Sequence, residues 1–360
     1  MHSYALVQQK QNCSGCLCFS ILVLISSFTL LAFAIYNIDI DHSLKLPYEE
    51  DQVELISQEY EQFMVTYKRH YLTKEEKQMR LQIFANNVRA IKDLQNSGKL
   101  THKIGVNQFA DMTKEEFRSY TGLQKGLNLR VHGAKTHTDV SNTGDIDWGT
   151  KGVLTPVKDQ QQCGSCYAFS GVCSAEALYA ANGNPLTSFS EQELVDCSVT
   201  LGNNGCNGGF PNNDFAYMMK NGIHTETDYP YVSGNGVAGT CKASTLGPAI
   251  FPVKGFTNVP YKDLDALQSA LNVNVVSIGI CADCDAFTYY KSGILKHFCC
   301  SDIDHAVALV ASGADGSTPW WRIRNSWGSS WGENGYVRFL KQTGSSDGVC
   351  GIGMQASYPN

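Results

Sequence analysis

Residues 158–171 read KDQQQCGSCYAFSG and place two cysteines three positions apart at the start of a run that is typical of a helix. Such a pair can be a redox centre, half of a zinc site, or a nucleophile beside a cysteine that forms a structural bridge. No βαβ pattern precedes the pair, which disfavours a thioredoxin-like redox centre. Zinc needs two further ligands, which Cys281-x-x-Cys284 or Cys299-Cys300 could supply. A thiolate zinc site is not expected, because the N-terminal apolar segment indicates an oxidising lumen that favours disulfides. The nucleophile is therefore the favoured interpretation.

Cys166 stands at the start of the helix expected over residues 165–181. The unpaired N–H groups and the dipole of a helix N-terminus favour the anionic form of a thiol. A thiolate also needs a cationic partner, and His305, which begins the strand-like run HAVALVAS, is a candidate. Asn325, which closes WWRIRN, could fix the tautomer of that imidazole. These three residues are far apart in the sequence, so the pattern alone does not bring them together.

Length and charge limit the classes of function. A chain of 360 residues with 43% hydrophobic residues can bury a sizeable core and has room for two or three domains. The net charge of −6 leaves no basic surface for nucleic acid, which we therefore exclude as a partner.

The N-terminal region, residues 1–39, contains an apolar span over residues 17–36 that is close to the length of a membrane crossing. Lys10 before it and Asp39 after it favour a cytosolic N-terminus, so we expect a signal-anchor. A cleaved signal peptide is the alternative, because Ala32-Phe33-Ala34 offers a small-x-small cleavage pattern. Both interpretations deliver the remaining chain to an oxidising lumen.

Residues 50–120 are predicted to be helical and to form a docking surface. Five residues recur at i, i+4, i+8, i+11 and i+15, which confines them to one helix face: Glu76, Arg80, Phe84, Asn87 and Ile91. A face that mixes charged, amide and apolar side chains indicates a buried polar network. Residues 121–141 lack periodicity and indicate an exposed, cleavable linker. One good helix and then several strands follow, which predicts an α+β fold.

These motifs resemble those of papain-family cysteine protease zymogens, most closely the cathepsin L-like branch, over residues 52–360. The resemblance implies a papain-like fold, with a helical left domain, a β-barrel-like right domain and the active site between them. A helical inhibitory prodomain would precede it. The implied segments are a prodomain over residues 50–120, a prosegment tail over 121–141 and a mature peptidase domain over 142–360. The helical half would cover about 142–250 and the β half 251–360. Below, residues 50–141 are called the prosegment.

The resemblance also assigns roles to individual residues. It makes Cys166 the nucleophile, His305 the general acid and base, and Asn325 the group that orients the imidazolium. Gln160 would stabilise the oxyanion with its side-chain amide. Trp327 would cover the contact between Asn325 and His305. Two positions depart from the family pattern, which usually has Trp at residue 167 and Gly at residue 161; here they are Tyr and Gln.

The helix face described above resembles the ERFNIN pattern of family prosegments, and GVNQFAD over residues 105–111 resembles its companion motif, G-x-N-x-F-x-D. The residues of that second motif are Gly105, Asn107, Phe109 and Asp111. Together they imply a prosegment whose tail runs backwards through the cleft as an inhibitor. Protonation of Glu76 or Asp111 would loosen it by depriving Arg80 or another partner of its contact. The mature enzyme would begin near Asn142.

Family pairing carried onto matching cysteines implies three disulfides: Cys163–Cys206, Cys197–Cys241 and Cys299–Cys350. Cys300 could replace its neighbour in the third bridge. Cys281 and Cys284 have no assigned family counterpart and could form a bridge with Cys300 or remain free, and Cys173 is interpreted as core packing.

The resemblance implies an endopeptidase that needs no metal or cofactor. Gly208 and Gly209 would let an extended peptide approach the cleft. The second pocket on the acyl side would prefer Leu or Phe, and its residues are Phe210, Pro211, Gly279, Ile303, Ala306 and, at the floor, Gln355. A monomer in a lysosome or vacuole, or secreted, is expected. The alternatives are a catalytically silent homologue that acts as a binding or storage protein, and a luminal disulfide or zinc protein.

Overall fold

The computed structural model describes residues 50–124, 134–141, 144–251, 253–300 and 302–360. The predicted apolar span and the maturation point near Asn142 lie outside these ranges. Among the residues described, there is no helix of the length and apolarity that a bilayer crossing requires.

The prosegment begins with two helices that pack through aromatic rings. Its elements are α2 (Glu50–Thr66), α3 (Lys74–Asn96), β1 (His102–Ile104), α4 (Lys114–Phe117), the 3₁₀ turn η1 (Arg118–Tyr120) and β2 (Ala134–Thr136). Thr73 caps α3, because its side chain accepts a hydrogen bond from the N–H of Glu76. The ring of Phe84 lies 5.3 Å from that of Tyr60 and 5.0 Å from that of Phe63, so the predicted face of α3 packs its aromatic member against α2.

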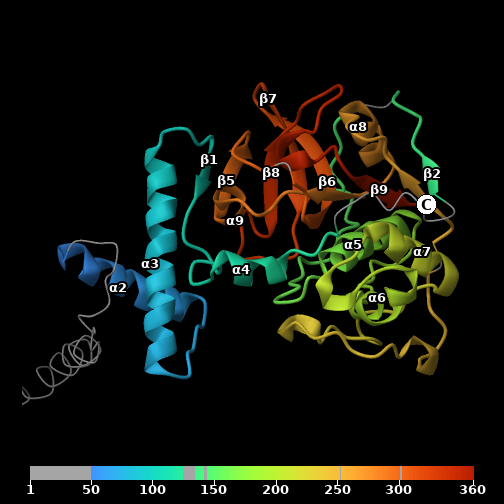
Figure 1. The fold of residues 1–360 in the computed structure, drawn as a ribbon. Helices are drawn as coiled ribbons and strands as arrows, with labels where there is room; N and C mark the ends of the chain where they lie inside the picture. Colours follow the sequence, from blue (N-terminus) through green and yellow to red (C-terminus); the bar gives the residue numbers. More distant parts are fainter. Residues whose placement is uncertain (1–49, 125–133, 142–143, 252, 301) are drawn as a thin grey trace, which may run out of the picture. The chain divides into compact units, whose positions relative to one another are not determined.

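Residues 144–250 form the helical half around α5. Its helices are α5 (Cys166–Ala181), α6 (Glu191–Cys197) and α7 (Pro211–Asn221), with the 3₁₀ turns η2 (Ser198–Leu201), η3 (Gly205–Asn207), η4 (Ser233–Asn235) and η5 (Ala243–Thr245). Every residue of α5 from Cys166 to Ala177 is buried, as expected for a helix that is covered on all sides. Figure 1 shows α5, α6 and α7 gathered beside the strands.

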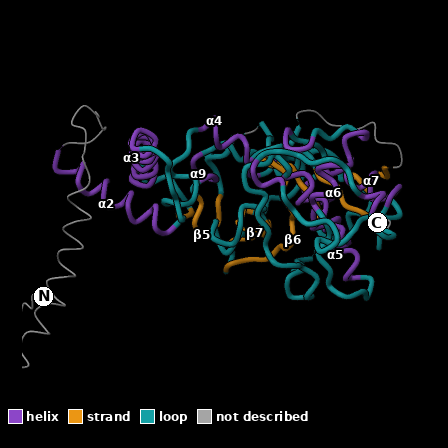
Figure 2. Tube along the Cα trace, turned by 90° about the horizontal axis from the view of Figure 1, so that it is seen from below, coloured by secondary structure: helices purple, strands orange, loops and turns teal. Residues whose placement is uncertain are grey.

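The remaining strands form one sheet with those of the prosegment. They are β3 (Phe256–Asn258), β4 (Val276–Ile280), β5 (Tyr290–Leu295), β6 (His305–Asp315), β7 (Thr318–Arg324), β8 (Tyr336–Leu340) and β9 (Ala356–Pro359), with α8 (Leu264–Val273), α9 (Asp285–Thr288) and η6 (Val349–Gly351) between them. The strand order is β1-β5-β8-β7-β6-β4-β9-β3-β2, so the prosegment supplies both outer strands. Figure 2 shows the strands β5, β6 and β7 to one side of the helices α6 and α7, with β6 next to α5. The predicted α+β arrangement is confirmed.

The two halves meet where β6 packs on α5. Ser170 of α5 donates a 2.6 Å hydrogen bond to the carbonyl of Val307 in β6. This contact sets the first residue of α5, Cys166, beside the first residues of β6, His305 and Ala306. The candidate site therefore lies at the first residues of helix α5 and strand β6, which are both buried there.

Four disulfides fix the loops around this centre. They are Cys163–Cys206, Cys197–Cys241, Cys281–Cys300 and Cys299–Cys350. The three implied pairs all form, and the surplus Cys300 pairs with Cys281. In the described chain, Cys166, Cys173 and Cys284 are free thiols. Because Cys163 is bonded to Cys206, Cys163 and Cys166 do not form a redox pair.

Candidate active site

The structure brings Cys166 and His305 together. The backbone N–H of Ala306, which follows His305, donates a 3.3 Å hydrogen bond to Sγ of Cys166. Both Cys166 and His305 are fully buried. Nε2 of His305 lies 2.8 Å from Oδ1 of Asn325, whereas its Nδ1 has no hydrogen-bond partner among the described atoms. Nδ1 is therefore the ring atom left to exchange a proton with the thiol.

Asn325 and Trp327 hold the imidazole in place. Oδ1 of Asn325 also accepts a 2.8 Å hydrogen bond from the N–H of Ser326, which fixes the amide beside the ring. The ring of Trp327 stacks on that of His305, with 4.7 Å between centroids and 25° between planes. Trp327 is 1% exposed and so keeps water away from the contact between His305 and Asn325.

The side-chain amide of Gln160 accepts a hydrogen bond from Ser326 and donates to two backbone carbonyls. Oγ of Ser326 donates a 2.6 Å hydrogen bond to Oε1 of Gln160, which fixes which end of the amide carries the donors. Its Nε2 donates to the carbonyls of Cys163 at 2.8 Å and Tyr120 at 3.1 Å. Nε1 of Trp327 also donates to the Tyr120 carbonyl, at 3.2 Å. The carbonyl of Tyr120, in the prosegment, thus accepts a hydrogen bond from the amide group that the family resemblance assigns to stabilising the oxyanion.

The prosegment continues through the site as an extended chain. The N–H groups of Gly122 and Leu123 donate to the carbonyl of Asp304, and the N–H of Gly209 donates to the carbonyl of Gly122. The bridge between Leu123 and Gly209 is parallel. A Cβ atom on Gly122 would lie 2.0 Å from the carbonyl oxygen of Gly164, so only glycine permits this approach.

Leu123 fills the pocket that the sequence assigned to a substrate side chain. It clusters with Cys166, Phe210 and Ala306, and Ile303 packs against this cluster. A Cβ atom on Gly279 would lie 2.8 Å from Leu123, 3.1 Å from Ile303 and 3.3 Å from Cβ of Gln355. Gly208 and Pro211 are the remaining expected residues. The carbonyl of Gly208 accepts a hydrogen bond from the side chain of Gln124, and Pro211 is the buried first residue of α7. The sequence predicted a tail in the cleft, but nothing in residues 121–124 singled out Leu123.

Burial favours the neutral forms of both Cys166 and His305. It raises the pKa of the Cys166 thiol to about 12, against the opposing effect of the N–H groups of Ala306, Gly122 and Tyr167. It lowers the pKa of His305 to about 4, although the hydrogen bond to Asn325 acts in the other direction. With the prosegment in place, the pair is therefore a thiol and a neutral imidazole.

The predicted docking network of the prosegment forms, with one change of partner. Nδ2 of Asn87 donates to the carbonyls of Ala110 and Met112, both at 2.9 Å. Arg80 pairs with Glu116 at 2.7 Å, whereas the carboxylate of Glu76 accepts from the N–H of Leu72 at 3.1 Å. The expectation that Glu76 holds Arg80 is therefore wrong. Glu116 lies on the next helix, α4, and sequence spacing within α3 could not reveal it.

The second motif attaches the prosegment to the β half. Asn107 donates a 2.7 Å hydrogen bond to the carbonyl of Thr288, and the N–H of Gly105 donates to the carbonyl of Tyr289. The ring of Phe109 meets Trp327 edge-on, with 5.0 Å between centroids. Asp111 faces back into the prosegment, where it pairs with Arg69 at 3.2 Å and accepts a 2.6 Å hydrogen bond from Tyr71. Ile91 is buried in α3.

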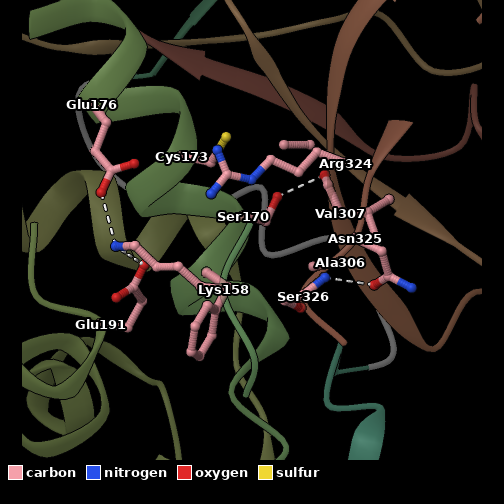
Figure 3. A pocket seen from close by; sticks show the side chains of 12 residues that line it. Lys158, Ser170, Cys173, Glu176, Glu191, Ala306, Val307, Arg324, Asn325 and Ser326 are labelled. Atoms are coloured by element: carbon pink, nitrogen blue, oxygen red, sulfur yellow. Dashed lines mark hydrogen bonds and ion pairs between the residues drawn. The ribbon is translucent and has the colours of Figure 1, made fainter. Parts of the chain in front are cut away.

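A buried ion cluster lies close to the residues predicted to be catalytic, and the sequence did not predict it. Nζ of Lys158 is 2.8 Å from the carboxylate of Glu176 and 2.6 Å from that of Glu191 (Figure 3). Arg324 donates a 2.8 Å hydrogen bond to the carbonyl of Thr155. Lys158, two residues from Gln160, contacts Glu176 of α5 directly. Arg324, adjacent to Asn325, is linked to Glu176 through Thr155, whose hydroxyl donates a 2.6 Å hydrogen bond to that carboxylate.

Comparisons with known proteins agree with this geometry. Residues 143–360 match the papain family cysteine protease, and residues 60–117 match the cathepsin propeptide inhibitor domain. The chain is 39% identical over 296 residues to a thiol protease of Hemerocallis sp., covering 79% of this chain and 81% of the relative. It is 37% identical over 306 residues to fruit bromelain of Ananas comosus, covering 83% and 85%.

Solved structures of precursors share the fold. A recombinant stem bromelain precursor superposes with a TM-score of 0.77 at 33% identity, covering 85% of this chain and 99% of that chain. The digestive procathepsin L 3 of the Tenebrio molitor larval midgut gives a TM-score of 0.73 at 34% identity, with the same coverage of 85% and 99%. The chain thus belongs to the papain family of cysteine proteases, and it carries an inhibitory propeptide of the kind that keeps such enzymes as zymogens.

Proposed function

We propose that Cys166 is the nucleophile of this cysteine endopeptidase, that His305 is its general acid and base, and that Asn325 orients His305. One observation carries the proposal: the N–H of Ala306 bonds to the sulfur, while the bond to Asn325 leaves Nδ1 of the neighbouring imidazole without another partner. A nucleophile, a base and an orienting group in this relation are what acyl transfer requires.

In the proposed reaction, Nδ1 of His305 takes the proton of Cys166 and the thiolate attacks the scissile carbonyl carbon. Gln160 and the N–H of Cys166 stabilise the oxyanion, a role for which the amide of Gln160 is already oriented by Ser326. The C–N bond breaks as His305 returns its proton to the leaving amine. Water then hydrolyses the thioester, again with His305 as base, which restores the thiol.

Substrate preference follows from the pocket that Leu123 occupies. A leucine side chain already fits among Phe210, Ala306 and Ile303, so we propose that substrates place Leu or Phe there. Gln355 borders the same pocket beside Gly279 and carries no charge to attract arginine. The bridge between Leu123 and Gly209 is parallel, whereas a substrate would run in the opposite direction and so present its carbonyl to Cys166 differently.

We further propose that residues 1–39 direct the chain into the secretory pathway as a signal-anchor, and that the enzyme acts in an acidic lysosome or vacuole. The apolar span over residues 17–36 and the four disulfides support an oxidising lumen. Translation into microsomes tests this: the part of the product after the apolar span should be protected from added protease, and the product without protease should keep its N-terminus. A protease-sensitive product would contradict lumenal entry, and an N-terminus near residue 35 would identify a cleaved signal peptide instead.

The decisive test compares the wild-type zymogen with Cys166→Ser after incubation at acid pH. The wild type should release its prosegment and then cleave peptides with Leu or Phe at the position bound by this pocket faster than peptides with Arg there. Cys166→Ser should do neither. Cys284→Ser is the matched control, because it removes a free thiol outside the site, and it should behave as the wild type. Self-processing by Cys166→Ser at the wild-type rate would refute the assignment.

A further inference from the structure

Asp214, in the first turn of α7, is a buried acid that the reaction above does not use. It has no exposed surface. Its Oδ1 accepts a 2.8 Å hydrogen bond from Nδ2 of Asn203, and its Oδ2 is buried with no hydrogen-bond partner. A fully buried carboxyl group with one donor is costly, so its presence calls for a physical reason.

Asn203 links Asp214 to the wall of the cleft. Its Nδ2 also donates to Oγ of Ser198, and its Oδ1 accepts a 2.8 Å hydrogen bond from the N–H of Phe210. Asn203 is 3% exposed, so water does not replace these partners. A Cβ atom on Gly209 would lie 2.4 Å from Oδ1 of Asn203, which shows how closely the amide approaches this backbone.

The catalytic helix makes room for the carboxyl group. A Cβ atom on Gly171 of α5 would lie 2.9 Å from Oδ2 of Asp214. Glycine is a poorer helix former than alanine, and the close approach of Asp214 gives a structural reason for glycine at residue 171. Gly171 lies five residues after Cys166 in α5. The close contact between Gly171 and Asp214 thus joins α7 to the helix that carries the nucleophile.

We propose that Asp214 is a positioning residue for substrate binding: through Asn203 it holds the backbone of Gly209 and Phe210, which the extended peptide and its apolar side chain contact. This inference rests on the proposed substrate cleft. Gly209 already pairs with the prosegment backbone on both sides, donating to the carbonyl of Gly122 and accepting from the N–H of Gln124. Phe210 contributes the pocket wall against Leu123.

Asp214 performs this role as a neutral acid. Burial raises its pKa well above the ordinary value, and the hydrogen bond from Asn203 only partly opposes this effect. From α5 the titratable group that faces it is Tyr167, which donates its hydroxyl to the carbonyl of Gly205 and offers no positive charge. On the other side, Asn203 and Ser198 are uncharged. Ionisation at higher pH would leave a buried carboxylate without a cation and would disturb the bond to Asn203.

The test measures KM and kcat of the activated enzyme with a peptide carrying Leu at the position bound by the apolar pocket. Asp214→Ala removes the acceptor for Asn203 and should raise KM about 3- to 10-fold, which corresponds to one lost hydrogen bond, with kcat nearly unchanged. Asp214→Asn keeps an acceptor oxygen and should preserve KM at acid pH. Asn203→Ala also removes the acceptor of the Phe210 N–H, so it should raise KM at least as much as Asp214→Ala. The double variant should be no worse than Asn203→Ala, because Asp214 acts only through Asn203.

Two controls separate positioning from simple packing. Gly171→Ala combined with Asp214→Ala refills the space beside α5 and should recover thermal stability without recovering KM. Asp228→Asn, which changes an acid whose hydrogen bond to Thr225 is solvent-exposed, should leave KM unchanged. As pH rises, the wild-type KM should increase at a pH where that of Asp214→Asn remains flat.

An unchanged KM in Asp214→Ala, or a KM restored by refilling the cavity, would overturn the inference. An identical rise of KM with pH in the wild type and Asp214→Asn would overturn the neutral-acid part. If the wild type itself failed to cleave the peptide, the proposed function would fail instead, so the two failures can be told apart.

Discussion

Gln161 illustrates how one residue next to the site bears a local conformational strain. Its φ is +53°, in the left-handed region that side chains disfavour, and family members usually have glycine here. The N–H of Gln161 donates a 2.9 Å hydrogen bond to the carboxylate of Asp159, which partly offsets the strain. The neighbouring Gln160 bonds through its amide to the carbonyl of Cys163, in the loop that leads to Cys166, so the turn is retained even with an unfavourable residue in it.

Gln161→Gly should therefore stabilise the protein by roughly 0.5–1 kcal/mol, because relief of a left-handed conformation outweighs the greater freedom of glycine in the unfolded chain. Urea unfolding of the inactive Cys166→Ser background would measure this without self-digestion. Gln162→Gly is the control: residue 162 is also exposed and has no positive φ, so glycine should destabilise there. Equal destabilisation by both variants would contradict the account.

At the level of elements, the ion pair between Arg80 and Glu116 joins α3 to α4 and thereby holds the helix that leads into the cleft. The hydrogen bond from Arg80 holds the pKa of Glu116 below its usual value. A carboxyl group whose pKa is depressed in the folded state stabilises that state above its unfolded pKa, and the contribution disappears as pH falls through the folded pKa. The pair is thus an acid-sensitive contact of the prosegment.

Glu116→Gln removes this charge at every pH and should shift prosegment release to higher pH. The side chain of Glu116 is 36% exposed, so solvent screening limits the loss to roughly 0.5–1 kcal/mol. The measurement is the rate of prosegment loss across a pH series. Glu115→Gln changes the exposed neighbour and should leave the midpoint in place. A coincident midpoint for Glu116→Gln and the wild type would show that this pair does not control release.

The same elements show what the sequence could predict. The face of α3 and the helix after Cys166 follow from local periodicity, and both lie where the sequence placed them. Family motifs supplied the residues that the structure brings together as Cys166, His305 and Asn325. Glu116 as the partner of Arg80, and Leu123 in the pocket, depend on how separate elements dock. Asp214 and Asn203 are likewise joined only by tertiary packing, which no local pattern specifies.

At the scale of the whole molecule, the prosegment acts at three places at once. It adds β1 to one edge of the sheet and β2 to the other, and it covers the cleft between them. His137, next to β2, extends the second contact through a 2.9 Å hydrogen bond between its ring and the hydroxyl of Tyr358. Maturation near residue 142 would remove both outer strands, so it would uncover two sheet edges as well as the site.

Uncovering the site should switch on the thiol itself. With the prosegment in place, burial raises the pKa of Cys166 to about 12 and lowers that of His305 to about 4, so thiolate is scarce near neutral pH. Removal of Leu123 and Tyr120 admits water, which lowers the desolvation penalty for both charged forms and allows the thiolate and imidazolium to form together. Reactivity towards alkylating agents therefore reports the covered and uncovered states directly.

We expect iodoacetamide to modify Cys166 at least 100-fold more slowly in the zymogen than in the mature enzyme at the same near-neutral pH, where thiolate is nearly absent from the covered pair. Peptide mass mapping of the alkylated protein would measure each thiol separately. Cys173 and Cys284, the other free thiols of the described chain, serve as internal references, and Cys166→Ser gives their background labelling. Equal rates for Cys166 in both forms would mean that covering does not silence the nucleophile, and that the prosegment inhibits only by blocking access for peptides.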